Sequence, residues 1–335
     1  MLRSFLPVAV AAVVLGAVQL AFGQSQFFVY LASLVCVNVV LAVSLNIING
    51  MTGQFSIGHA GFMAVGAYTA GMLTLATKDY GIKFMPEVVS DQALFIVSLL
   101  GAGVVAAACG FLVGLPSLRL KGDYLAIVTL GFGEIIRVVV QNSEQLGGSL
   151  GLSGVPQRSS VAMVGFWVFV VVLTARRIAD SSHGRALWAI REDEIAAEAM
   201  GVDTTGYKVR AFVVSSFFAG VAGGLFAHFV PVINPGSFTF VKSMEVVVMI
   251  VAGGLGSTTG AVMGAVILTL LPEGMRSLFI VLGGADASLA QKVDQIRMPI
   301  YGVLLMVMML VRPQGFFGTR EIWDFLGKRR KGAAT

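Results

Sequence analysis

The sequence predicts an all-α fold, a polytopic bundle of helices in a membrane. Hydrophobic residues make up 56% of the 335 residues and charged residues only 12%, and the mean hydropathy is +0.86. Soluble domains carry about 25% charged residues, so composition alone excludes an ordinary soluble domain. Apolar runs long enough for a spanning helix, about 20 residues each, recur along the chain and predict about eight to ten spans, some interrupted by glycine or re-entrant.

Most of the spans are clear from their apolar runs. The clear runs are 5–23, 27–47, 56–77, 93–115, 160–177, 209–231 and 298–312. The first run ends in Ala21-Phe22-Gly23, which resembles a signal-peptidase site. However, it is longer than the usual signal core of about 7–15 residues, and further spans follow it. We therefore expect a retained N-terminal helix (1–26), a transmembrane domain (27–315) and a basic tail (316–335).

Two further apolar stretches have more than one interpretation. The stretch 122–142 carries Glu134 and Arg137, which lie three residues apart and so on one helical face. Charges within a membrane normally pair or face water. We favour an intramembrane ion pair over a polar lining of a path. The region 243–272 is broken by Gly253-Gly254-Leu255-Gly256 and predicts a hairpin, a re-entrant pair or one broken helix.

The distribution of Lys and Arg predicts the orientation, because cytoplasmic loops carry an excess of both. With the N-terminus in the cytoplasm and the region 243–272 returning to its own side, 15 of the 23 basic residues fall on the cytoplasmic side and Arg137 falls inside a span. Seven fall on the opposite side: Lys78, Lys83, Arg158, Lys242, Arg276, Lys292 and Arg297. Both termini and the polar segment 176–210 are thus expected in the cytoplasm.

The segment 176–210 is a charged island between apolar spans. It holds six basic residues and six acidic ones: Asp180, Glu192, Asp193, Glu194, Glu198 and Asp203. Residues 185–201 are rich in helix formers and end at Gly201, a typical stop, so we expect one helix. Its apolar face is interrupted by Arg191 and Glu198. Such a helix can dock into a partner's groove or lie on the membrane, and a solvated loop is the plainer alternative.

Two glycine-rich segments predict a central path. The first carries Gln54, Ser56, Gly58, His59 and Gly61, and the second carries Gly256 and Gly260. Glycine-interrupted segments in the two halves of a transporter often meet at a substrate site near the middle of the bilayer. Close helix packing is an equally good explanation for any single glycine.

The sequence contains no recognisable catalytic set. A phosphate-binding loop and a His-Glu-x-x-His motif are absent, and the three histidines and two cysteines (Cys36 and Cys109) form no metal-ligand pattern. We therefore expect no enzyme activity, no cofactor and no metal. The basic residues flank apolar spans rather than forming a groove, which argues against nucleic acid. Uphill transport would need energy from another chain or an ion gradient.

Several collinear motifs identify a family. They are residues 44–62 with 65–70, residues 118–132, residues 147–152 and residues 184–191. Together they resemble the permease subunits of bacterial branched-chain amino acid ABC importers, in particular the larger of the two permeases. The resemblance covers roughly 35–315. The island also partly matches the family's cytoplasmic Glu-Ala-Ala-x-x-x-Gly signature at Ala196, Ala197 and Gly201, with Ile195 in place of the glutamate.

The resemblance implies a machine with several subunits. Its other members would be a second related permease, two cytoplasmic ATPases and an extracytoplasmic binding protein, in the lipid of the bacterial inner membrane. The residues expected to couple to the ATPases are Glu192, Asp193, Glu194, Ala196, Ala197, Glu198 and Gly201. The implied cargo is leucine, isoleucine and valine, with urea or short-chain amides next. An ion-coupled secondary amino acid transporter is the alternative outside this family.

Overall fold

The structure, a computed structural model, describes residues 26–77, 87–117 and 123–283 and isolated positions between 299 and 321. The long helices are α2 (Gln26–Asn46), α3 (His59–Thr77), α4 (Glu87–Ser117), α5 (Asp123–Asn142), α6 (Val161–Asp180), α9 (Thr204–Ala227) and α11 (Thr258–Gly283). The shorter ones are α7 (Ser182–Glu192), α8 (Glu194–Ala199) and α10 (Phe240–Gly253). The short turns and strands are η1 (Ile47–Met51), η2 (Glu144–Leu146), η3 (Gly148–Leu150), η4 (Pro235–Phe238), β1 (Leu152–Ser153) and β2 (Val232–Ile233).

The polytopic all-α membrane fold is confirmed. Within the described ranges, seven helices are long and apolar enough to cross a membrane: α2 continued by η1, α3, α4, α5, α6, α9 and α11. They include the doubtful stretch 122–142, which forms α5. The expected span 5–23 and most of the expected span 298–312 lie outside the described residues.

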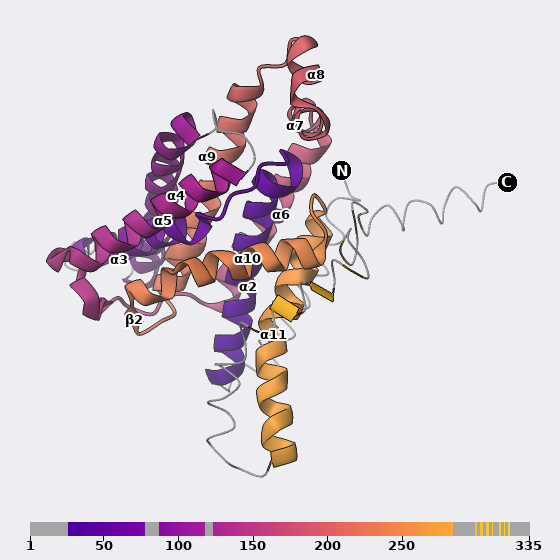
Figure 1. The fold of residues 1–335 in the computed structure, drawn as a ribbon. Helices are drawn as coiled ribbons and strands as arrows, with labels where there is room; N and C mark the ends of the chain where they lie inside the picture. The colour runs from indigo at the N-terminus through magenta and orange to yellow at the C-terminus, as the bar shows by residue number, and fades with distance from the viewer. Residues whose placement is uncertain are drawn as a thin grey trace, which may run out of the picture.

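The long helices alternate in direction, which gives the bundle two ends (Figure 1). At one end, called the α7 end, α7 contacts η1: Arg191 Nη1 lies 2.6 Å from the Gly50 carbonyl oxygen. At the other, called the β end, β1 pairs with β2, and the Tyr68 hydroxyl donates to the Ile233 carbonyl at 2.8 Å. Glu321 of the tail accepts hydrogen bonds from the Thr258 and Thr259 amides, so this tail residue lies at the α7 end.

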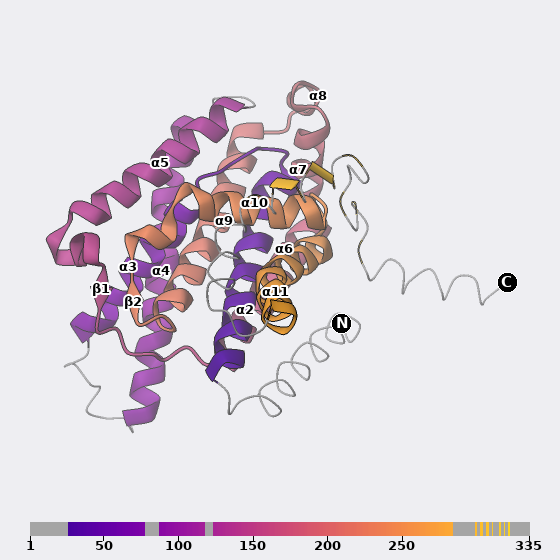
Figure 2. The same cartoon turned by 60° about the horizontal axis from the view of Figure 1, so that its bottom comes forward.

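Small residues bring α3, α4 and α9 together in the core. A Cβ atom added at Gly66 of α3 would collide with the backbone of Gly220 in α9, and one added at Gly110 of α4 would collide with Ser216. Such close approach is the usual way that membrane helices gain packing contacts, because lipid supplies no hydrophobic driving force between them. Figure 2 shows these three helices side by side.

The region 243–272 forms a hairpin of unequal arms. The helix α10 has 14 residues, fewer than the roughly 20 that a bilayer crossing needs. It runs across α2 in both overall views (Figures 1 and 2), and its C-terminal end packs on α11, where an added Cβ at Gly253 would meet the Gly260 backbone. The hairpin was one of the three interpretations that the glycine break left open.

Lys242, which the charge count assigned to the opposite side, belongs to the first turn of α10, and its side chain is only 16% exposed. Its Nζ atom donates to Asn38 Oδ1 of α2 at 3.0 Å and to Glu245 Oε2 at 3.3 Å. Asn38 in turn donates to Thr269 Oγ1 of α11 at 2.9 Å. A largely buried ammonium needs such partners; Glu245 lies on the same helix, whereas Asn38 comes from a helix far away in the sequence. Without Lys242, six basic residues remain assigned to the side opposite the cytoplasm.

Candidate functional site

The charged island forms the part of the chain between α6 and α9 at the α7 end. The expected single helix over 185–201 is wrong, because the helix breaks at Asp193 into α7 and α8. Asp193 is extended, and its Oδ1 atom accepts from the amides of Ile195 at 2.9 Å and Ala196 at 3.1 Å. An aspartate that caps a helix N-terminus competes in this way with continuing the helix through itself.

The predicted helix stop at Gly201 is confirmed. Gly201 has φ +83°, and the Val202 amide donates to the Ala197 carbonyl oxygen at 3.0 Å, one turn back. No atom lies within 4 Å of an added Cβ at Gly201. This glycine is therefore needed for its left-handed backbone rather than for space.

Two of the expected coupling carboxylates hold α8 against α9. Glu194 pairs with the buried Lys208 at 2.7 Å, and Glu198 accepts from the Thr204 hydroxyl at 2.6 Å. Their contacts are within the chain, so a change at either would also alter how α8 is held.

The surface of α8 that faces away from the bundle is partly apolar. Ile195 is 73% exposed and Met200 is 84% exposed, with the exposed Glu192 and Ala196 beside them. Sequence reasoning placed Ile195 on the apolar face of the expected helix but did not select Met200. A large apolar residue inside a charged segment is the signal that could have found Met200. We call Glu192, Ile195, Ala196 and Met200 the α8 surface.

The helix α7 is fixed on its inner side by packing and by one arginine. Leu187 and Ile190 are buried. Arg191, which interrupts the apolar face, donates from Nη1 to the Gly50 carbonyl, and its guanidinium carbon lies 5.2 Å from the centre of the Trp188 ring. A guanidinium over an indole face is a favourable cation–π contact.

The two glycine-interrupted segments meet at this arginine. An added Cβ at Gly53 would lie 2.9 Å from Arg191 Cγ, and one at Gly256 would lie 2.7 Å from Arg191 Nη1. Asn46 joins the segments, because its Oδ1 atom accepts from the Gly256 amide at 2.9 Å and its Nδ2 atom donates to the Ser257 carbonyl at 3.3 Å. We call Asn46, Gly50, Gly53, Trp188, Arg191 and Gly256 the α7 junction.

Three polar path candidates lie inside the bundle. The Ser56 backbone exchanges two hydrogen bonds of 3.2 Å with the Asn49 side chain, and His59 Nε2 lies 2.8 Å from Ser44 Oγ. Gln54 is 8% exposed, and its Oε1 atom has no hydrogen-bond partner among the described residues.

Three of the path glycines lie at contacts between helices. Gly58 approaches the Thr129 carbonyl of α5, and an added Cβ at Gly61 would lie 2.7 Å from Gly133 Cα of the same helix. An added Cβ at Gly260 would lie 2.5 Å from the Gly253 carbonyl oxygen in α10. These contacts favour close packing, and a role in lining the path remains a prediction.

Glu134 and Arg137 lie 2.7 Å apart on α5, with side chains 32% and 27% exposed. The second oxygen of Glu134 accepts from the Phe240 amide at 3.1 Å, at the first residue of α10. A carboxylate at a helix N-terminus is favourable because amide N–H groups and the helix dipole both point toward it. The pair thus joins α5 to the short arm of the hairpin.

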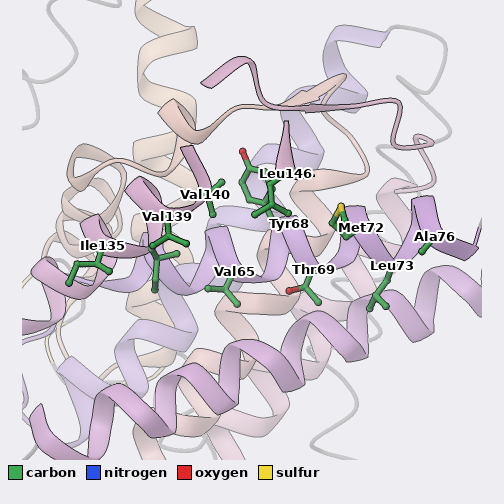
Figure 3. A pocket seen from close by; sticks show the side chains of 11 residues that line it. Val65, Tyr68, Thr69, Met72, Leu73, Ala76, Ile135, Val139, Val140 and Leu146 are labelled. Carbon is green, nitrogen blue, oxygen red and sulfur yellow. The ribbon is translucent and has the colours of Figure 1, made fainter. Parts of the chain in front are cut away.

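The groove between α3 and α5 is apolar (Figure 3). It encloses about 580 Å³, and its lining includes Val65, Met72, Ile135 and Val139. The Tyr68 hydroxyl, one of the two hydroxyls in its lining, already donates to the Ile233 carbonyl. None of the path candidates lines the groove, and its lining offers no charged partner to the carboxylate or ammonium of an amino acid. Among the described residues, no cluster of His, Cys, Asp and Glu could hold a metal ion.

Comparisons with known proteins point to one family. The family model "Branched-chain amino acid transport system / permease component" matches residues 27–312. The high-affinity branched-chain amino acid transport system permease protein LivM of Escherichia coli K12 is 35% identical over 334 residues, covering 89% of this chain and 72% of that protein. A probable LivM of Methanocaldococcus jannaschii and LivH of Escherichia coli K12 are each 24% identical, covering 84% of this chain and 91% of each relative.

Proposed function

Because the chain belongs to the family of permease components of branched-chain amino acid transport systems, we propose that it is one of two membrane subunits of an ATP-driven importer. The cargo that the relatives' names support is leucine, isoleucine and valine. The chain itself carries no phosphate-binding loop, so ATP hydrolysis would occur on separate ATPase subunits. The bacterial inner membrane is the expected location, with the α7 end and both termini in the cytoplasm.

The observation that carries this proposal is the α7–α8 segment. Its outer surface presents Ile195 and Met200 beside acidic residues, while on its inner side Arg191 is hydrogen-bonded to the Gly50 carbonyl of η1. An ATPase groove would suit the outer surface, because exposed apolar side chains with a polar rim are typical of protein contacts. A secondary transporter has no need for such a segment.

The other partners follow from the same family membership. Both LivM and LivH are similar to this chain over most of its length, which supports pairing with a second, related permease. An extracytoplasmic binding protein would deliver cargo at the β end. Urea and short-chain amides remain the alternative cargo, because nothing in the apolar groove selects an amino acid.

The test is reconstitution in proteoliposomes with two ATPase subunits, a second related permease and a binding protein from the same organism. We expect uptake of labelled leucine, isoleucine and valine that requires ATP and survives collapse of the ion gradients by ionophores. Stimulation of ATP hydrolysis by urea or acetamide, but not by leucine, would show that the cargo is urea or a short-chain amide instead of a branched-chain amino acid. Ionophore-sensitive uptake without the ATPases would overturn the proposal.

A further inference from the structure

We propose that Arg191 is the positioning residue that makes the α7–α8 segment move as one piece with both glycine-interrupted segments. This inference rests on the proposed function, since it concerns how movement of a docked ATPase would reach the interior. Arg191 belongs to α7, yet its guanidinium lies among residues of two other parts of the chain. Its hydrogen bond to Gly50 spans 141 positions of sequence.

The group that accepts the hydrogen bond from Arg191 is a carbonyl at the end of a helix. Gly50 belongs to η1, the π-helical turn that ends at Met51, and carbonyl groups in the last turn of a helix lack partners within the helix. A cation there is favoured by both the free carbonyl and the helix dipole. The bond is also charge-assisted, which makes it stronger than an ordinary amide bond. Arg191 is thus bonded to the point where the span formed by α2 and η1 ends.

The arginine is also enclosed by the backbone on both sides. Gly53 and Gly256 have φ values of +71° and +89°, and a Cβ atom at either position would approach the Arg191 side chain within 3 Å. Asn46 ties the Gly256 turn to the end of α2 by two hydrogen bonds. Displacement of the guanidinium would therefore press on the chain leading to α3 and on the turn between α10 and α11.

Arg191 is not what folds α7. The buried Leu187 and Ile190 hold the helix against the bundle, and the Ser181 side chain caps its N-terminus by accepting from the Gly184 amide at 3.2 Å. Loss of the guanidinium should leave α7 in place while breaking its bonded link to the junction. A role in coupling can therefore be separated from a role in stability.

The test compares Arg191→Gln and Arg191→Lys with Arg185→Gln in the complete reconstituted complex. Arg185 is an exposed residue of the same helix, so it controls for the change in charge. We expect Arg191→Gln to assemble with the ATPases and hydrolyse ATP, while leucine taken up per ATP falls about tenfold, within the range usual for coupling between two sites. Arg191→Lys should be intermediate, because lysine can donate to Gly50 but cannot stack as a plane on Trp188. Arg185→Gln should match the wild type.

A distance measurement distinguishes coupling by Arg191 from a purely structural role of this residue. Spin labels at Ala189 of α7 and Leu255 of the turn should keep one distance with and without ATP in the wild-type complex. The distance should change on adding ATP to Arg191→Gln.

Three results would overturn the inference: normal uptake per ATP in Arg191→Gln, loss of assembly in step with loss of uptake, or a distance that changes in the wild type. A wild-type complex without ATP-dependent uptake would instead contradict the proposed function itself.

Discussion

At the scale of single residues, two charged side chains of the described helices, Lys242 and Arg137, each have a partner. Lys242 contacts Asn38 and Glu245, and Arg137 contacts Glu134. Charges at membrane depth are costly without such partners. The result is that α5, α10 and α2 are joined by polar contacts in a chain that is otherwise held by apolar packing.

The Glu134–Arg137 pair offers a test of this view. Glu134→Gln keeps an oxygen for the Phe240 amide but leaves the Arg137 charge unmatched. Breaking a fully buried pair costs about 3–5 kcal/mol; because these side chains are about a third exposed, we expect about 1–2 kcal/mol. Thermal unfolding in detergent should show a lower midpoint for Glu134→Gln, with partial recovery in Glu134→Gln/Arg137→Gln. Glu144→Gln, an exposed carboxylate of η2, is the control. An unchanged midpoint in the single variant would contradict the prediction.

At the scale of elements, the division into two short helices, α7 and α8, lets the chain turn between them. Because Asp193 ends α7 and starts α8, the chain changes direction there. The α8 helix can then pack on α9 through Glu194–Lys208 while Ile195 and Met200 face outward. The expected coupling residues thus divide into those that hold α8 and those that are open to a partner.

This division predicts which substitutions affect docking alone. Ile195→Glu and Met200→Glu change exposed side chains, for which effects on stability are usually within about 0.5 kcal/mol. We expect each to weaken association with the ATPases about tenfold, or ~1.4 kcal/mol, measured as ATPase co-purified with the detergent-solubilised permease. Leu150→Glu, at an 86% exposed apolar residue of the β end, should retain the ATPases. Equal losses in all three variants would indicate misfolding or a different docking surface.

At the scale of the whole molecule, the alternation of the helices places the charged island and the strands at opposite ends. Ser182 begins α7 and Ser149 lies in η3 beside β1, so they mark the two ends. Glu321 of the tail lies with Ser182 at the α7 end. The side of the membrane on which each end lies stays a prediction from the Lys and Arg distribution.

The orientation can be tested with single cysteines in a variant without Cys36 and Cys109. Cysteines at Ser182 and Lys331 should react with an impermeant maleimide only from the cytoplasmic side, and one at Ser149 only from outside. Inverted vesicles provide the matched measurement, in which each pattern should reverse. Labelling of Ser149 from the cytoplasm would invert the assignment and remove the argument for ATPase docking with it.

The sequence by itself determined the membrane class, most of the spans, the charged island and the stop at Gly201. The spans follow from apolar runs that are long enough to cross a bilayer, and the stop at Gly201 follows from the backbone preference of glycine. Both properties depend on residues that are close together in the sequence. The break at Asp193 is also a local feature. Helix propensity favours one continuous helix there, but capping by the Asp193 side chain favours a new helix start, and capping prevails.

Only the tertiary structure decided what the polar and glycine residues contact. Arg191 meets Gly50 across 141 positions, and Asn46 meets Gly256 across 210. Lys242 meets Asn38 across 204 positions. Periodicity and spacing report which face of a helix a residue occupies, but not which other helix that face meets. The contacts of these buried groups depend on how the helices pack, and no single segment of the sequence carries that information.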